Sequence, residues 1–290
     1  MTTLIQTLIS GLRLGSIYAL MALGYTMVYG IAKMLNFAHG DIIMVGAYAV
    51  ISTVSLAQLP GVVGVAVSVV VCVFLGVTIE FLAYRPLRKA PSLAVLITAI
   101  GVSYLLQSLA LLVFKSEPKA FPTIIEIPSL TFGGVVVDGM TLLTLAVTAV
   151  IMISLSLFIN KTKLGKAMRA VSEDKDAAEL MGISVNRTIT MTFAIGSALA
   201  AVASVFYGAT YTYIKPTTGS MPGIKAFTAA VFGGSIPGAM LGGIMLGIIE
   251  QLSQRYISTL WTNAIVFGVL VLVLVVKPTG LLGKKISEKV

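Results

Sequence analysis

Long apolar runs separated by short polar breaks make up most of the sequence. Nine such runs are present, at residues 4–30, 37–57, 61–83, 92–114, 140–159, 188–213, 221–235, 238–253 and 258–277. Most approach the roughly 20 residues that a helix needs to cross about 30 Å of hydrocarbon, and they lack the short alternation of barrel strands. The pattern therefore predicts an all-α fold, a polytopic bundle of transmembrane helices with about 8–9 spans.

Two of the runs, 221–235 and 238–253, are short for a full crossing. A break rich in glycine, with one proline, separates them at residues 233–238. Such a break interrupts a helix, so the region 221–253 is either two spans joined by a tight turn or a re-entrant or broken pair.

Composition agrees with a membrane protein. Hydrophobic residues make up 57% and charged residues 11% of the 290-residue chain, whereas soluble domains carry about 25% charged residues. The net charge of +9 is not gathered into a basic patch with interleaved aromatic residues, so we exclude nucleic acid as a partner. The single cysteine, Cys72, lies within an apolar run, which excludes an intrachain disulfide and a cysteine-based metal cluster.

Basic residues are distributed unevenly between the breaks. If Arg85, Arg88 and Lys89 are cytoplasmic, 14 basic residues fall on the cytoplasmic side and 5 on the external side. Lysine and arginine accumulate in cytoplasmic loops, which favours this arrangement. It predicts an external amino terminus and a cytoplasmic carboxyl terminus that carries Lys284, Lys285 and Lys289. The proline-rich residues 115–139 then form an external loop or short hairpin.

One polar segment concentrates the charge. The chain has 20 basic and 11 acidic residues, and ten of these charged residues lie within residues 161–187. Ser172, followed by the acidic residues Glu173, Asp174 and Asp176, has the pattern of a helix N-cap, and Gly182 that of a helix stop. A helix of about ten residues is too short to be stable alone, so it needs a surface to lie on. Its apolar contacts would come from Ala177, Ala178, Leu180 and Met181. A solvated connector is the alternative.

A second polar group precedes the second apolar run. It consists of Asn36, His39, Gly40 and Asp41. Burying a charged aspartate in hydrocarbon is costly unless it is paired or near water, so Asp41 is expected to face protein or an aqueous gap. The group is either a hydrogen-bonded structural corner or part of a gate.

Three further ionisable residues lie in or near the spans. Arg13 is expected to form an interhelical hydrogen bond or ion pair, and Glu80 and Glu250 are expected at the membrane interface.

Small residues suggest close helix packing, and aromatic and hydroxyl residues suggest a possible translocation path. Gly238, Gly242, Gly243 and Gly247 form two consecutive GxxxG patterns, which let helix backbones approach closely within one chain or between subunits. Residues that either line a path or belong to an interfacial aromatic belt are Tyr18, Tyr25, Thr26, Tyr29, Thr210 and Tyr211.

The sequence contains no nucleotide-binding or hydrolytic motif. The pairs Gly165-Lys166 and Gly283-Lys284 lack the remaining residues of a Walker A loop, and neither HExxH nor GxSxG occurs. If the chain moves a solute uphill, the energy must come from a partner or an ion gradient. The sequence predicts neither enzymatic activity nor a bound cofactor or metal in this chain.

Several segments together resemble a known family. The chain is similar to the membrane-spanning permease subunits, of the LivH type, of ABC importers for branched-chain amino acids. The segments that carry the resemblance are Gly15–Gly30, Leu35–Asp41, Arg85–Arg88, Leu164–Ala170 and Lys277–Gly283. In addition, residues 176–182 fit the EAA-and-glycine loop of ABC importers, with aspartate in place of the first glutamate.

The resemblance implies a single transmembrane permease domain, residues 1–290, in a prokaryotic cytoplasmic membrane. It further implies that the cytoplasmic loop 160–187 holds a coupling helix, formed by Asp174, Asp176, Ala177, Ala178, Glu179, Leu180, Met181 and Gly182. The implied partners are a second, related permease, two ATP-binding subunits that hold ATP and magnesium, and an external solute-binding protein. Related permeases handle urea or short amides, so the resemblance alone leaves the substrate open.

The competing hypothesis is a self-contained, ion-coupled secondary transporter of small polar solutes. Its coupling residues would be Arg13, Asp41 and Glu80. Such a carrier has no need for a short docking helix.

Overall fold

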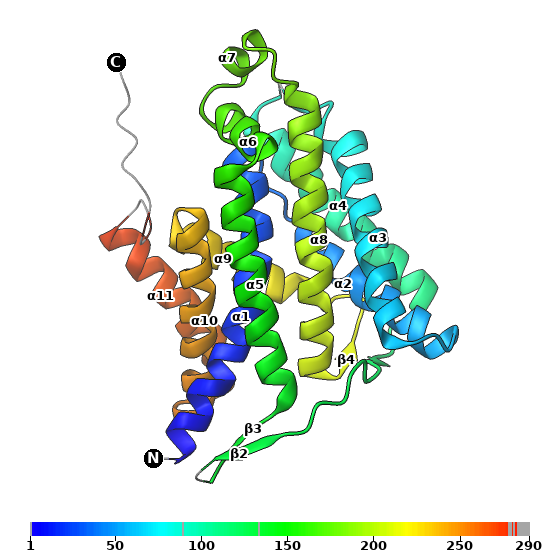
Figure 1. Ribbon diagram of the computed structural model, residues 1–290, viewed down its shortest axis with the longest axis vertical. Helices are drawn as coiled ribbons and strands as arrows, with labels where there is room; N and C mark the ends of the chain where they lie inside the picture. Colours follow the sequence, from blue (N-terminus) through cyan, green and yellow to red (C-terminus); the bar gives the residue numbers. More distant parts are fainter. Residues whose placement is uncertain (1, 89, 133, 278–279, 281, 283–290) are drawn as a thin grey trace. The chain divides into compact units, whose positions relative to one another are not determined.

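The apolar runs fold into helices in the computed structural model, which describes residues 2–88, 90–132, 134–277, 280 and 282 (Figure 1). The helices are α1 (Thr2–Ala32), α2 (His39–Ile51), α3 (Gly61–Ile79), α4 (Ser92–Phe114), α5 (Gly139–Lys161), α6 (Lys163–Glu173), α7 (Lys175–Leu180), α8 (Val185–Tyr211), α9 (Ser220–Gly233), α10 (Ile236–Tyr256) and α11 (Thr262–Val276). Two π-helical turns, η1 (Ser52–Leu56) and η2 (Glu80–Tyr84), continue α2 and α3. The predicted polytopic helical bundle is confirmed.

Seven helices of the described chain are long and apolar enough to cross a membrane. They are α1, α2 with η1, α3 with η2, α4, α5, α8 and α10. The other two apolar runs form α9, with 14 residues, and α11, with 15 residues, which are shorter than the roughly 20 residues of a full crossing. The nine runs of the sequence therefore exceed the number of long helices.

The break between α9 and α10 is a tight turn. Gly234 adopts a positive φ of 69°, and the Ser235 hydroxyl accepts a hydrogen bond from the Gly238 amide at 3.2 Å, which caps α10. A Cβ atom on Gly233 would meet the backbone of Gly238 and Ala239. This close approach explains why glycine is needed on both sides of the turn.

The chain divides into two units. Unit 1 consists of residues 1–26, 127–152 and 225–290, and unit 2 of residues 27–126 and 153–224. Three of the four boundaries lie inside α1, α5 and α9, and the fourth, at 126/127, lies in the segment between β1 and β2. Each unit is thus assembled from segments far apart in the sequence.

In unit 1, α1 and α10 pack antiparallel through a stripe of small residues. A Cβ atom added to Gly15 would lie 2.7 Å from the Ile244 Cα, and one added to Gly243 would lie 2.5 Å from the Ala19 Cα. One on Gly247 would meet the backbone of Gly15. Of the predicted GxxxG glycines, Gly243 and Gly247 therefore lie at the contact with α1, whereas Gly242 faces Ala229 of α9 and Gly238 faces Gly233 at the turn. Only small residues allow these approaches.

In unit 2, α2, α3 and α8 form the core. Gly46 of α2 faces the side chains of Ser68 and Cys72 of α3 and of Ser204 of α8. The Ser68 hydroxyl donates to the Gly46 carbonyl at 2.9 Å, so the polar group is satisfied inside an apolar core.

Strands are confined to the connecting segments. In unit 1, β2 (Leu130–Phe132) and β3 (Val135–Val137) form an antiparallel hairpin, in which Gly134 has a φ of 81°. In unit 2, β1 (Lys119–Ala120) pairs with β4 (Tyr213–Ile214). The prediction of an ordered loop or hairpin for residues 115–139 agrees with these pairings.

Candidate functional site

The charged segment 161–187 folds into two short helices, α6 and α7, in unit 2 (Figure 1). The Thr162 hydroxyl caps α6 by accepting from the Gly165 amide at 3.0 Å. Met168 and Val171, one turn apart on α6, are buried. Amphipathic packing therefore anchors α6, while α7 follows it at the tip of the segment.

The predicted N-cap at Ser172 is wrong. Ser172 lies inside α6, where its hydroxyl donates to the Arg169 carbonyl at 2.7 Å. The chain leaves the helix at Asp174, whose extended backbone lets its carboxylate accept from the amides of Asp176 at 2.9 Å and Ala177 at 3.0 Å. Asp174 is thus the cap of α7, and α7 has six residues where the sequence predicted about ten.

Gly182 ends α7 as predicted. Its φ is 82°, the Gly182 amide donates to Glu179 at 2.9 Å, and the Ile183 amide donates to Ala178 at 3.0 Å. These two bonds are those of a Schellman motif, which requires a left-handed residue at this position. Both ends of α7 are therefore fixed by local hydrogen bonds.

The apolar side chains of α7 divide into two groups. Ala178 is buried, whereas Leu180 is 89% and Met181 82% exposed. Exposing two large apolar side chains to water at the tip of a charged segment is unfavourable. This end of α7 is suited to insertion into a groove of another protein.

Lys175 ties α7 to the end of α1. Its ammonium donates to the carbonyl of Ala32, the last residue of α1, at 3.0 Å. A cation is favourable at this position because the carbonyls at a helix carboxyl end are unpaired and partly negative. Burial, and then the charges of Arg88 and Lys33, lower the pKa of the Lys175 ammonium below its ordinary value.

Asp174→Ala is expected to destabilise α7 by about 1 kcal/mol, because two amide donors lose their acceptor. Amide hydrogen exchange of residues 175–182 should then be about fivefold faster. Asp176→Asn is the matched control, since Asp176 is exposed and caps no amide among the described residues. Equal exchange in Asp174→Ala and the unmodified chain would contradict the capping role.

The predicted polar corner is buried in unit 2. Asn36, His39 and Asp41 are at most 4% exposed. The Asp41 carboxylate accepts from the Gln107 amide of α4 at 3.0 Å, and the same amide lies 3.1 Å from the Ser220 hydroxyl of α9. Asp41 therefore faces protein, and the corner connects the start of α2 to α4 and α9.

The remaining corner residues make close contacts as well. Tyr84 of η2 donates to the Asn36 side-chain oxygen at 3.0 Å. A Cβ atom on Gly40 would collide with the Gly219 carbonyl, so glycine is needed where α2 meets the segment before α9.

Glu80, which was expected at the membrane interface, lies inside the protein. It is fully buried in η2, where it pairs with Arg88 and accepts from the Thr190 hydroxyl of α8 at 2.7 Å. Arg88 also donates to Asn186 of α8. The buried carboxylate is thus compensated by a cation and a hydroxyl, as a charge in this environment requires.

Sequence reasoning missed a buried charged cluster in unit 1. Lys225 of α9 and Glu250 of α10 form an ion pair at 2.6 Å, and the Tyr18 hydroxyl of α1 donates to Glu250 at 2.9 Å. Lys225 is 7% and Glu250 2% exposed, so both charged groups are enclosed by protein. Opposite charges within neighbouring apolar runs were the available signal.

Each of the remaining predicted residues is described by its own contacts. Arg13 forms the expected ion pair, with Asp138 at 2.9 Å. Among the path residues, Tyr25 meets the Phe227 ring edge-on at 5.9 Å, and the rings of Tyr207 and Tyr211 lie 4.4 Å apart. The hydroxyls of Thr26 and Thr210 donate to carbonyls of their own helices, and Tyr29 is 52% exposed.

The basic residues Lys89, Lys284, Lys285 and Lys289 and the motif residue Gly283 lie outside the described residues. Lys277 ends the last described helix, where its amide donates to Val273 at 2.7 Å.

Comparison with known proteins gives the family. A model described as "Branched-chain amino acid transport system / permease component" matches residues 7–275. The chain is 45% identical to the high-affinity branched-chain amino acid transport system permease protein BraD of Pseudomonas aeruginosa, over 99% of this chain and 98% of BraD. It is 42% identical to the corresponding protein LivH of Escherichia coli K12, over 99% of this chain and 97% of LivH. With its helical membrane fold and these full-length matches, the chain belongs to the family of branched-chain amino acid transport system permease components.

Proposed function

We propose that the chain is the membrane-spanning subunit of an ABC importer that carries branched-chain amino acids across the prokaryotic cytoplasmic membrane. Transport is driven by ATP hydrolysis in separate subunits, which bind ATP and magnesium. Two relatives named for high-affinity branched-chain amino acid transport, matched over nearly their whole length, support the substrate class.

The observation that carries the mechanism is α7. It is capped at both ends and presents Leu180 and Met181 to solvent at the tip of the charged segment. A rigid short helix with an exposed apolar end can receive a push from a partner and transmit it without unfolding. We assign α7 and Gly182 as the coupling helix within the cytoplasmic loop 160–187.

A route from α7 into unit 2 follows from its contacts. Lys175 links α7 to the last carbonyl of α1, and the short connector after α1 leads to the corner at Asn36 and Asp41. The corner in turn contacts η2, α4 and α9 through Tyr84, Gln107 and Ser220. Movement of α7 would therefore bias the packing of several helices, which is what a switch between two access states needs.

The proposed assembly contains a second, related permease, two ATP-binding subunits and an external solute-binding protein. We place the amino terminus outside and the carboxyl terminus in the cytoplasm. The antiparallel packing of α10 on α1 brings the end of α10 to the face where α1 begins, so this topology requires α11 to lead the chain back across the membrane.

The ion-coupled carrier finds less support. Two of its three coupling residues are engaged in ion pairs, Arg13 with Asp138 and Glu80 with Arg88. The third, Asp41, holds the Gln107 amide.

Uptake by the reconstituted importer tests the proposal. Proteoliposomes that contain the full complex and internal ATP, supplied with the binding protein, are expected to accumulate leucine, isoleucine and valine. Urea, acetamide and glutamate should not accumulate, and an ATPase subunit with its Walker A lysine replaced is the control for energy supply. Uptake by this chain alone, driven by an ion gradient and indifferent to ATP, would overturn the assignment.

A further inference from the structure

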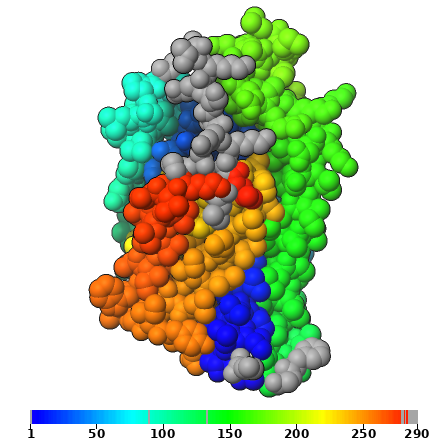
Figure 2. Space-filling model, turned by 90° about the vertical axis from the view of Figure 1, so that its left-hand side faces the viewer, coloured from blue at the N-terminus to red at the C-terminus, as the bar shows by residue number. Residues whose placement is uncertain are grey.

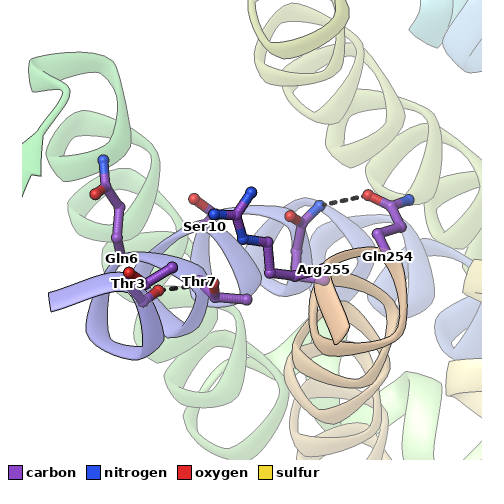
Figure 3. A pocket seen from close by; sticks show the side chains of 7 residues that line it. Thr3, Gln6, Thr7, Ser10, Gln254 and Arg255 are labelled. Atoms are coloured by element: carbon purple, nitrogen blue, oxygen red, sulfur yellow. Dashed lines mark hydrogen bonds between the residues drawn. The ribbon is translucent and has the colours of Figure 1, made fainter. Parts of the chain in front are cut away.

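Unit 1 contains a polar cavity of about 440 Å³ at one end of the contact between α1 and α10 (Figure 3). Its lining consists of Thr3, Gln6, Thr7 and Ser10 of α1 and Gln251, Gln254 and Arg255 of α10. Every lining residue is polar, although both helices belong to the set that can cross a membrane.

The cavity opens where the stripe of glycines ends. Gly11 of α1 faces Ile248 of α10 so closely that a Cβ atom would lie 2.9 Å from the Ile248 Cα. One turn before Gly11, the same face of α1 carries Thr7. One turn after Gly247, the same face of α10 carries Gln251. These larger side chains prevent the close approach that glycine permits, so a space lined by their polar groups remains.

Arg255 is the single charged residue of the lining. Its guanidinium points from α10 towards Ser10 of α1 (Figure 3). No carboxylate of the described residues lies within ion-pair distance of it. The amide of Gln251 donates to Gln254 at 3.4 Å and that of Gln254 to Glu250 at 3.5 Å. The cavity therefore offers one positive charge and several neutral hydrogen-bonding groups to an anion.

The surroundings place this cavity at the depth of lipid head groups. Tyr256, directly after Arg255, is 57% exposed, Trp261, in the segment that follows α10, is 65% exposed, and Leu4 of α1 is 46% exposed. Exposed aromatic residues at the ends of membrane helices mark the boundary between hydrocarbon and water. Figure 2 shows the start of α1, in blue, and α10 with the following loop, in orange, on the surface of the molecule.

We propose that the cavity binds the phosphate of an anionic phospholipid, such as phosphatidylglycerol, with Arg255 as the charged contact. A planar guanidinium suits the paired oxygens of a phosphodiester, and the hydroxyl and amide groups complete its hydrogen bonds. The apolar residues exposed beside the cavity would contact the acyl chains. Free phosphate shares the head-group chemistry but lacks this apolar part, which favours the lipid as the occupant.

Trp261 provides a built-in reporter, because the chain contains 1 tryptophan and that residue is exposed near the cavity. The full chain is reconstituted into phosphatidylcholine vesicles, and phosphatidylglycerol with brominated acyl chains is titrated in. Bromine quenches the fluorescence of Trp261 when the lipid binds beside it. The unmodified chain is expected to prefer phosphatidylglycerol over brominated phosphatidylcholine by about tenfold.

Variants separate the site from general membrane charge. Arg255→Gln is expected to abolish the preference, and Ser10→Leu, which fills the cavity but retains the charge, should weaken it. Lys115→Gln, which removes one charge from an exposed position outside the lining, should retain it. Circular dichroism of each variant verifies folding.

Two results would overturn the proposal. If Arg255→Gln kept the preference for phosphatidylglycerol over phosphatidylcholine, the cavity would not be the cause of that preference. No preference of the unmodified chain for brominated phosphatidylglycerol, together with a change of Trp261 fluorescence on adding inorganic phosphate, would identify a site for free phosphate and exclude the lipid assignment. Neither result depends on transport, so the test is independent of the proposed substrate and partners.

Discussion

Glu250→Ala is expected to lower the free energy of unfolding by about 3–5 kcal/mol, because it leaves the Lys225 ammonium buried without its carboxylate. The Tyr18 hydroxyl loses its acceptor in the same step. Both groups are nearly inaccessible to water, so solvent cannot replace the lost partner. Unfolding of the detergent-solubilised chain by sodium dodecyl sulfate, followed by circular dichroism, measures the loss.

A double variant distinguishes an unpaired charge from lost packing. Lys225→Met with Glu250→Leu removes both charges and keeps most of the volume, so its stability should return to within about 1 kcal/mol of the unmodified chain. Glu126→Ala is the control, since Glu126 is exposed and its loss should change stability by less than about 0.5 kcal/mol. A double variant as unstable as Glu250→Ala would show that the charge is not the cause.

Leu180→Glu is expected to reduce ATP-driven uptake by at least about tenfold, because it places a charge where the proposed ATP-binding subunit would bury an apolar side chain. Leu180 is 89% exposed, so the substitution should leave the folding of the chain itself unchanged. Copurification of the ATP-binding subunit and uptake into proteoliposomes are the two measurements. The combined variant with Met181→Glu should lose both completely.

Asn160→Glu is the matched control for this experiment, since it introduces the same charge at an exposed position outside α7. Its uptake and copurification should match those of the unmodified chain. Normal uptake in the Leu180→Glu, Met181→Glu double variant would rule out α7 as the coupling helix.

The long helices could be predicted because apolar runs of sufficient length determine them. The stop at Gly182 and the close packing at Gly243 and Gly247 also follow from local rules, since both depend on the missing Cβ atom. Arg13 was expected to find a partner because an unpaired guanidinium in a membrane helix is costly. Its partner, Asp138, comes from a distant segment, which no local pattern identifies.

The wrong N-cap prediction concerns a competition between two residues, and the burial of two carboxylates was not predicted. Ser172 and Asp174 are both good caps, and the amphipathic face of α6 decides between them by extending the helix past Ser172. Glu80 and Glu250 were placed at interfaces because they stood near the ends of apolar runs. In the structure, η2 continues α3 beyond Glu80 and α10 extends to Tyr256, and both carboxylates are buried beside protein partners that the runs did not indicate.

The division of the chain also sets the timing of biogenesis. Tyr18 and its partner Glu250 are separated by 232 positions. The glycines of α1 likewise contact α10, which is synthesised much later than α1. At a synthesis rate of about 5–20 residues per second, α1 spends roughly 10–50 s in the membrane before α10 emerges. During this time the glycine stripe of α1 lacks its native partner α10, and for the first part of it the guanidinium of Arg13 also lacks Asp138, 125 positions away. The first helix of the chain must therefore be held by the insertion machinery or by lipid until the last third of the protein has been made.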